Sequence, residues 1–165
     1  MVINVITSSV AVIRELRVSD WTDSENSIEI IVEGAGNYEY SIDGENYQSS
    51  PKFNGLEVGE YIVYVKDSNG CGVVSQQTYF LIYPKFFTPN GDGYNEKWQI
   101  KPSVLEPELK VFIFDYSGKL ITFLDGRSDG WDGTFNNQKL PSDDYWFVVE
   151  RKSGKTFKGH FTLMR

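Results

Sequence analysis

The residues best suited to bind a metal ion lie in a short glycine-rich segment, Asn90-Gly91-Asp92-Gly93-Tyr94-Asn95-Glu96. Oxygen-bearing side chains at alternate positions, separated by glycines, are typical of a loop that wraps calcium. The EF-hand pattern is not met, because the fifth, sixth and twelfth residues counted from Asn90 are of the wrong type. Two interpretations follow: a partial calcium site that uses Asn90, Asp92, Asn95 and donors from elsewhere, or a tight turn. We favour the turn.

Two groups of carboxylates are candidates for acid–base catalysis: Asp129 and Asp132 around Trp131, and the pair Asp143-Asp144. Paired carboxylates serve this purpose in glycosidases. Both groups lie in turn-like sequence, however, with no length of chain around them suited to form a cleft. We favour a turn role, in which the Asp side chains cap the turns and Trp131 anchors its loop to the core.

His160 is the single histidine. A catalytic triad would need it between a carboxylate and a nucleophile, and no Ser stands in a nucleophile-elbow sequence. We interpret His160 as a surface or interface residue, and we expect the chain not to be an enzyme.

Trp98, Trp131 and Trp146 are candidates for an exposed platform on which sugar rings stack. Trp146 alternates within a predicted strand and is equally suited to a core. A carbohydrate-binding accessory module of a secreted enzyme is therefore an alternative function for this chain.

The elements that must position these residues are short strands. Aromatic residues reach 15% and Ala occurs at two positions, which favours pleated sheets over helices. Gly, Asn, Asp and Ser turns separate the apolar runs at regular spacing, a pattern typical of sandwiches. We expect an all-β chain of two tandem immunoglobulin-like β-sandwich domains. The predicted strands are residues 2–6, 11–21, 28–33, 38–42, 60–66, 73–82, 97–100, 109–115, 119–123, 145–151 and 155–164, with a loop at 53–61.

The charge distribution predicts where the two domains meet. Residues 1–83 carry a net charge of −8 and residues 84–165 a net charge of +1, so we place the boundary at Tyr83-Pro84. The acidic total of −7 argues against nucleic acid and anionic lipid as partners. No apolar run approaches the roughly 20 residues of a membrane helix, so we expect no transmembrane segment.

The last predicted strand has nearly complete alternation. Phe157, Gly159, Phe161 and Leu163 fall on one face, and the other face holds Thr156, Lys158, His160, Thr162 and Met164. Five basic residues and no acid follow Glu150: Arg151, Lys152, Lys155, Lys158 and Arg165. This run is either a solvated face or a docking edge for an acidic partner.

The second half resembles a known family in five ordered blocks. They are Tyr83–Gly93 (YPKFFTPNGDG), Ile113–Leu120 (IFDYSGKL), Gly130–Gly133 (GWDG), Leu140–Phe147 (LPSDDYWF) and Lys158–Arg165 (KGHFTLMR). This series resembles the gliding-motility-associated C-terminal domain, the type B sorting domain of the type IX secretion system. One difference is Glu96, where Asp is usual in the family. Residues 1–83 are similar to immunoglobulin-like repeats of large gliding adhesins.

The resemblance implies a function that the residues alone do not supply. Such a domain is the export signal of secreted cargo. It is recognised in the periplasm by the type IX translocon, carried through the outer membrane, and retained at the cell surface or released outside. Type B domains are associated with a porin-like outer-membrane partner. We expect recognition to use the final strand, with Phe161 and Leu163 holding it in the core, Lys158, His160 and Arg165 facing outward, and Gly159 in the inner row. No cofactor is required, with calcium as the one candidate.

Overall fold

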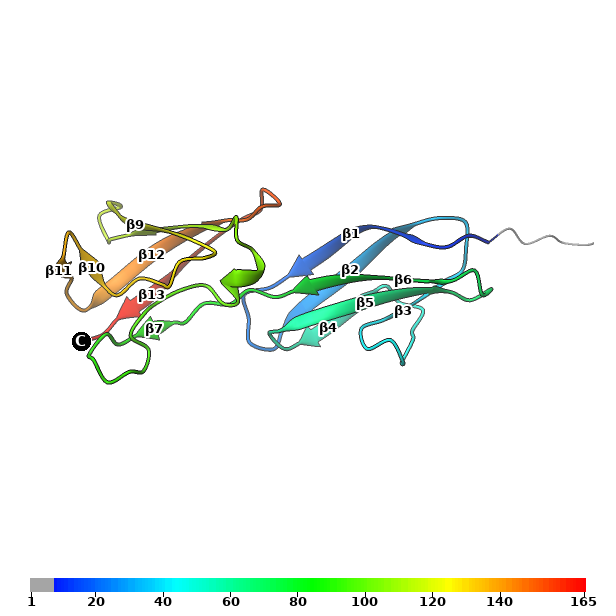
Figure 1. Ribbon diagram of the computed structural model, residues 1–165, viewed down its shortest axis with the longest axis horizontal. Coiled ribbons are helices and arrows are strands. Elements are labelled where there is room, and N and C mark those ends of the chain that lie inside the picture. Colours follow the sequence, from blue (N-terminus) through cyan, green and yellow to red (C-terminus); the bar gives the residue numbers. More distant parts are fainter. Residues whose placement is uncertain (1–7) are drawn as a thin grey trace, which may run out of the picture. The chain divides into compact units, whose positions relative to one another are not determined.

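The computed structural model describes residues 8–165, and the strand predicted at residues 2–6 lies outside them. The chain is all-β, as predicted, and forms two compact units, Met1–Phe80 and Leu81–Arg165. Figure 1 shows the strands of each unit. The division falls ahead of Tyr83-Pro84, and the ring of Tyr83 packs on Phe147 of the second unit at 4.7 Å.

The first unit is a sandwich of two three-stranded antiparallel sheets. One has the order β1 (Val12–Ser19), β2 (Asn26–Glu33), β4 (Lys52–Leu56), and the other β3 (Tyr38–Ser41), β5 (Glu60–Asp67), β6 (Val73–Tyr79). These orders correspond to strands A-B-E and C-F-G of an immunoglobulin sandwich. The inward residues of β2 and β5 form the centre of its core: Ile28, Ile30, Val63 and Val65.

The loop expected over residues 53–61 is wrong at its start, because Lys52–Leu56 is strand β4 and pairs with β2. Phe53 and Leu56 pack on the core, while Gly55 has φ of 67° and the register shifts beside it. A glycine in the left-handed region within a strand marks an irregularity in the ladder. The Asn54-Gly55 dipeptide therefore gives this strand the composition of a turn.

The second unit is built on a five-stranded sheet. Its order is β7 (Phe86–Phe87), β13 (Thr156–Leu163), β12 (Asp143–Glu150), β8 (Lys110–Phe114) and β9 (Leu120–Asp125). All pairs are antiparallel except β7 with β13. A small hairpin, β10 (Thr134–Phe135) and β11 (Gln138–Lys139), turns at two asparagines with positive φ, and the helix η1 (Ser103–Leu105) is a single 3-10 turn.

The strand expected over residues 97–100 is reduced to one isolated bridge, at Trp98, with a second bridge just beyond it at Lys101. Trp98 pairs with Trp131, and Lys101 pairs with Ile82. The indoles of Trp98 and Trp131 lie against Phe161 of β13, so these bridged segments form the layer that covers the inner face of the sheet. The second unit is thus a sandwich whose second layer is mostly irregular.

Candidate recognition strand at the end of the second unit

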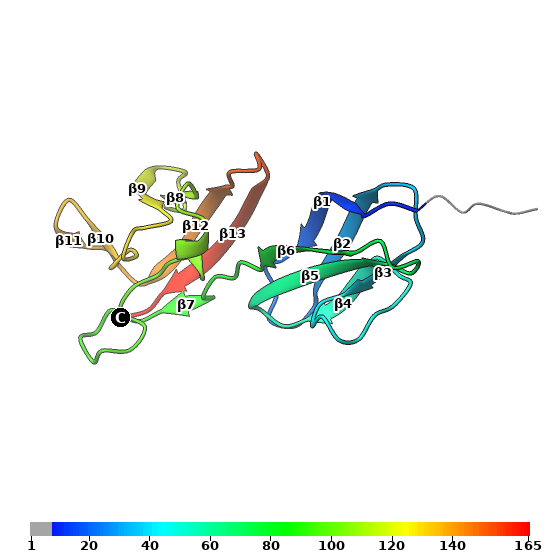
Figure 2. The ribbon, with the colours of Figure 1, turned by 45° about the vertical axis from the view of Figure 1, so that its right-hand side comes forward.

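Strand β13 lies between β12 and the short β7, as Figures 1 and 2 both show. It pairs with β12 along its whole length, from Thr156 opposite Glu150 to Leu163 opposite Asp143. On its other side it pairs with β7 only at Thr162 and Leu163.

The alternation predicted for this strand is confirmed. Phe161 and Leu163 are fully buried, whereas Lys158 and His160 are exposed. Burying large apolar side chains on one face fixes the register, because a shift by one residue would turn them all to solvent. The exposed side chains are therefore presented in a defined order.

Phe161 lies at the centre of an aromatic cluster. Its ring stacks on Trp98 with centroids 4.0 Å apart and planes at 16°. Four further rings have centroids within about 6 Å of it: Phe87, Trp131, Tyr145 and Phe147. Aromatic pairs at these separations stabilise beyond the area that they bury. The sequence-predicted role of Phe161 as a core anchor agrees with this position.

Gly159 lies where β13 passes over the ring of Phe147. A Cβ atom on Gly159 would approach Phe147 Cζ at 2.7 Å and Tyr83 Oη at 3.2 Å. Since Phe147 is 1% exposed and packed among other rings, it has little room to shift. The glycine is required by this close approach and not by its backbone conformation.

Arg165 is exposed, but its guanidinium is engaged within the domain. Nε donates to Leu140 O at 2.9 Å, Nη1 to Pro89 O at 3.1 Å and Nη2 to Gly133 O at 3.0 Å. Arg165 therefore fastens the end of β13 to three loops. We expected the side chain of Arg165 to face outward, but its guanidinium binds these three carbonyls instead.

Two other members of the basic run are also paired. Arg151 binds Glu106, with Nε and Nη2 each 3.0 Å from Oε2, and both side chains are largely buried. Lys152 binds Glu108 at 2.8 Å in an exposed pair. Sequence reasoning missed Glu106 and Glu108, because they lie more than forty residues before their partners and no local pattern connects them.

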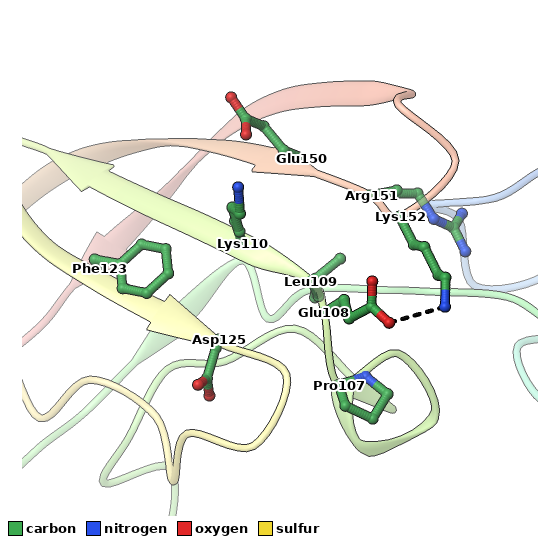
Figure 3. Close-up of a pocket in the computed structure, with 9 residues that line it drawn as sticks. All are labelled: Pro107, Glu108, Leu109, Lys110, Phe123, Asp125, Glu150, Arg151 and Lys152. Atoms are coloured by element: carbon green, nitrogen blue, oxygen red, sulfur yellow. Dashed lines mark hydrogen bonds and ion pairs between the residues drawn. The ribbon is translucent and has the colours of Figure 1, made fainter.

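The Lys152–Glu108 pair borders a shallow depression of about 470 Å³, drawn in Figure 3. Lys110, Asp125 and Glu150 also line it. Three acids and three bases line it in all, so the formal charges of its lining cancel.

The proposed calcium loop closes on its own amides. Asn90 Oδ1 accepts from the Asp92 amide at 2.9 Å, and Asp92 Oδ1 accepts from Tyr94 at 2.8 Å. Glu96 Oε1 accepts from the amides of two glycines. The amide of Tyr94, together with the side-chain amide of Asn90, which donates to Asp92 Oδ2 at 2.9 Å, holds the pKa of Asp92 below its ordinary value of 3.8. Asn95 has φ of 50° and its carbonyl accepts from Thr88.

These hydrogen bonds are what the favoured turn interpretation predicts. Among residues 8–165, no group of three His, Cys, Asp or Glu side chains is arranged to hold a metal ion. A calcium ion here would depend on Asp92 together with amide and main-chain oxygens. The site stays a prediction.

Of the carboxylates considered for catalysis, Asp132 caps a turn, as predicted, whereas the turn expected at Asp143-Asp144 is wrong, because both residues belong to strand β12. Asp132 Oδ1 accepts from the amide and hydroxyl of Thr134, at 3.0 and 2.7 Å. Asp144 accepts from the hydroxyl of Thr162, and Asp129 pairs with Lys97.

The candidate platform of three exposed tryptophans is wrong, whereas the favoured role of Trp131, which anchors its loop to the core, is confirmed. Trp98 is 0% and Trp131 4% exposed, and their indole N–H groups donate to Pro84 O and Thr134 O, both at 2.8 Å. Trp146, which the sequence leaves between core and surface, is 43% exposed. The two buried indoles come from irregular segments whose burial depends on the sheet beneath them.

Trp146 belongs to an apolar area on the outer face of the sheet. The register places it between His160 of β13 and Phe114 of β8. Phe123 of β9 is 49% exposed, and its ring packs on Phe112 at 5.3 Å. Aromatic side chains exposed on a sheet face are typical of binding surfaces.

Among residues 8–165, no helix has the length and apolar character needed to cross a membrane. A comparison with curated proteins found no match. Among solved structures, PorZ of the type-IX secretion system of Porphyromonas gingivalis is similar, with 14% identity and a TM-score of 0.41, over 91% of this chain and 23% of PorZ. Latent PorU from the same organism has 16% identity and a TM-score of 0.31, over 96% and 20%. The chain thus spans less than a quarter of either protein.

A family model matches the second unit. The CHU_C type IX secretion signal domain covers residues 80–163, which includes every strand from β7 to β13. The matched region ends on Leu163, the last residue of the candidate recognition strand. A domain of this kind implies association with the type IX secretion system and export to the cell surface or extracellular space. The chain belongs to the family of type IX secretion signal domains.

Proposed function

We propose that the second unit is a non-enzymatic, type B sorting signal. The first unit is then part of the surface adhesin that this signal directs to export. The cargo passes through the periplasm and the outer membrane, with a porin-like outer-membrane protein as partner, and serves adhesion or gliding at the outer surface. No cofactor takes part. The observation that carries the proposal is β13: its inner row is locked into an aromatic cluster while Lys158 and His160 remain exposed.

This arrangement suits a signal that is read in the folded state. A receptor that reads side chains needs them in a fixed order, and the buried inner row supplies that order at the surface of a rigid sheet. Because the first unit has its own core, the two functions divide between the two units.

The test is export of a passenger. Residues 81–165 are fused to a fluorescent protein with an N-terminal signal for the periplasm, and the fusion is expressed in a gliding bacterium. Surface exposure is measured by protease digestion of intact cells, in the parent and in a strain without the type IX translocon. Fluorescent protein that reaches the surface in the parent alone supports the proposal. A fusion that stays periplasmic while natural cargo is exported overturns it.

Deleting residues 158–165 should abolish export, but it also removes the core residues Phe161 and Leu163. The double variant Lys158→Ala, His160→Ala is the matched comparison, because both side chains are exposed and the fold is retained. Export that survives the deletion would refute the role of the final strand.

The second candidate, a carbohydrate-binding module, is favoured by the exposure of Trp146 on the same outer face of the sheet as Phe123. Its test is titration with soluble polysaccharides, comparing the parent chain with Trp146→Ala. Binding that disappears in this variant would support it, and flat titrations across the panel would remove it. Trp131→Ala is unsuitable for this purpose, since that indole belongs to the core.

A further inference from the structure

We propose that the open edge of β13, from Thr156 to His160, binds an extended acidic polypeptide segment as an added strand. This inference rests on the proposed function, because it names how a partner reads the sorting strand. Two observations support the proposal: backbone groups of β13 that are unpaired at this edge, and a local surplus of positive charge around it.

The backbone on this side of β13 is only partly used. Thr162 N–H donates to Lys85 O at 2.9 Å and Met164 N–H donates to Phe87 O at 3.0 Å. Backbone groups alternate in direction along a strand, so those of Lys158 and His160 point to the same side as those of Thr162. Within the described part of the chain, no backbone group pairs with them there.

The pairing ends because the chain ahead of β7 is anchored elsewhere. Pro84 has a fixed φ and no amide, and its carbonyl accepts from the indole of Trp98 at 2.8 Å. β7 therefore begins at Phe86 and covers only the last residues of β13. The uncovered stretch of five residues is about 16 Å long.

This edge has little of the protection that edge strands usually carry. Bulges and prolines are common safeguards, yet β13 keeps one continuous register with β12 over eight residue pairs and contains no proline. Lysine is the safeguard that is present, and it opposes neutral or basic strands while favouring an acidic one.

The charges around the edge have the same sign. Lys85, Lys155 and Lys158 form no ion pair with any residue in 8–165, in contrast to Arg151 and Lys152. Lys85 lies over the ring of Tyr83 at 3.7 Å, at the end of the edge where β7 begins.

The acids on the outer face of the sheet are set back from this edge. Asp144 and Glu150 stand on β12, opposite Thr162 and Thr156, and Asp144 is bound to the hydroxyl of Thr162 at 2.6 Å. An added strand would lie on the other side of β13, next to the lysines. A segment with Asp or Glu at alternate positions would thus gain both main-chain hydrogen bonds and charge attraction.

The experiment uses the whole chain, labelled with ¹⁵N, and a synthetic peptide of about ten residues in which Thr and Glu alternate. We expect the peptide to shift the amide signals of Lys158 and His160, and a peptide of alternating Thr and Lys to leave them unchanged. Equal shifts with both peptides, or none with either, would overturn the proposal.

Two variants separate the backbone from the side chain. His160→Thr and His160→Pro both lose the imidazole, but only the proline variant loses the N–H that faces the open edge. We expect affinity for the Thr-Glu peptide to fall by about tenfold in the proline variant and to change little in the threonine variant. Equal losses in both variants would mean recognition through the imidazole and would contradict strand addition.

Separate controls distinguish a loss of folding from a loss of peptide binding and from a loss of export. Tryptophan fluorescence checks that His160→Pro keeps its fold; if it does not, a Thr-Glu peptide with N-methylated edge amides tests the same bonds on the parent chain and should not bind. In the export assay, failure of the parent fusion would refute the sorting function without bearing on the peptide result. Normal export by a folded His160→Pro fusion would refute strand addition as the way the signal is read.

Discussion

Replacing Phe161 by Ala should remove much of the stability of the second unit. The side chain is 0% exposed and its ring stacks on Trp98 at 4.0 Å among four other aromatic rings. Truncating a buried Phe costs about 3–5 kcal/mol, through lost transfer free energy and the cavity that remains. A rigid aromatic cluster cannot collapse easily into that cavity, so we expect the upper half of this range.

A loss of this size is large beside the roughly 5–15 kcal/mol by which whole domains are stable. Guanidinium denaturation followed by tryptophan fluorescence is the assay, because three of the four tryptophans (Trp98, Trp131 and Trp146) belong to the second unit. Lys158→Ala is the matched control on the same strand, and its free energy of unfolding should change by no more than about 0.5 kcal/mol. A Phe161→Ala midpoint equal to that of Lys158→Ala would refute the assignment of Phe161 as a core anchor.

Three further predictions concern a buried ion pair, a buried acid and the glycine-rich loop. Glu106→Ala should lower the free energy of unfolding by about 3–5 kcal/mol, because it removes the carboxylate that pairs with the largely buried Arg151. Glu108→Ala, which breaks an exposed pair, should lower it by at most about 1 kcal/mol. Similar losses in urea titrations of the two variants would be evidence against this difference. The hydroxyl of Ser8 and the amide of Cys71 lower the pKa of Asp67 from 3.8 to about 2, so its contribution to the stability of the first unit is complete above the unfolded value and is lost as the pH falls through about 2. The stability of Asp67→Asn should therefore lack the loss that the parent shows as the pH falls through about 2. Identical pH profiles of stability for the variant and the parent would contradict this prediction. Removing calcium with a chelator should leave the melting temperature unchanged if the Asn90–Asn95 loop is a turn, whereas a calcium-dependent rise that Asp92→Ala abolishes would establish the site instead.

The local period of two was sufficient to predict which side chains of β13 are buried and which are exposed. Phe161 and Leu163 turn inward and Lys158 and His160 outward because successive side chains of a strand point to opposite faces, which needs no knowledge of the partner strands. The turn role of Asp132 is equally local, since its carboxylate binds Thr134 two residues on. The all-β class and the family resemblance followed from composition and from blocks of consecutive residues.

Features that depend on distant pairing were decided by the tertiary structure. Trp98 lies in an irregular segment, and its burial follows from contacts with Phe147 and Phe161 of the sheet, which no local pattern indicates. The basic run resembles one uniform patch in the sequence, yet Glu106 and Glu108 pair two of its members and three loop carbonyls occupy Arg165.

The sequence by itself thus determined the fold class, the family and the two faces of the last strand. Only the tertiary structure decided which of its charges remain unpaired and where its edge is open. The physical reason is the distance along the chain over which each effect acts. Side-chain alternation and turn chemistry act between near neighbours, whereas an open edge depends on how far a distant strand extends beside it. Here β7 begins only at Phe86, opposite Thr162, so the backbone groups of Lys158 and His160 are left available to a partner.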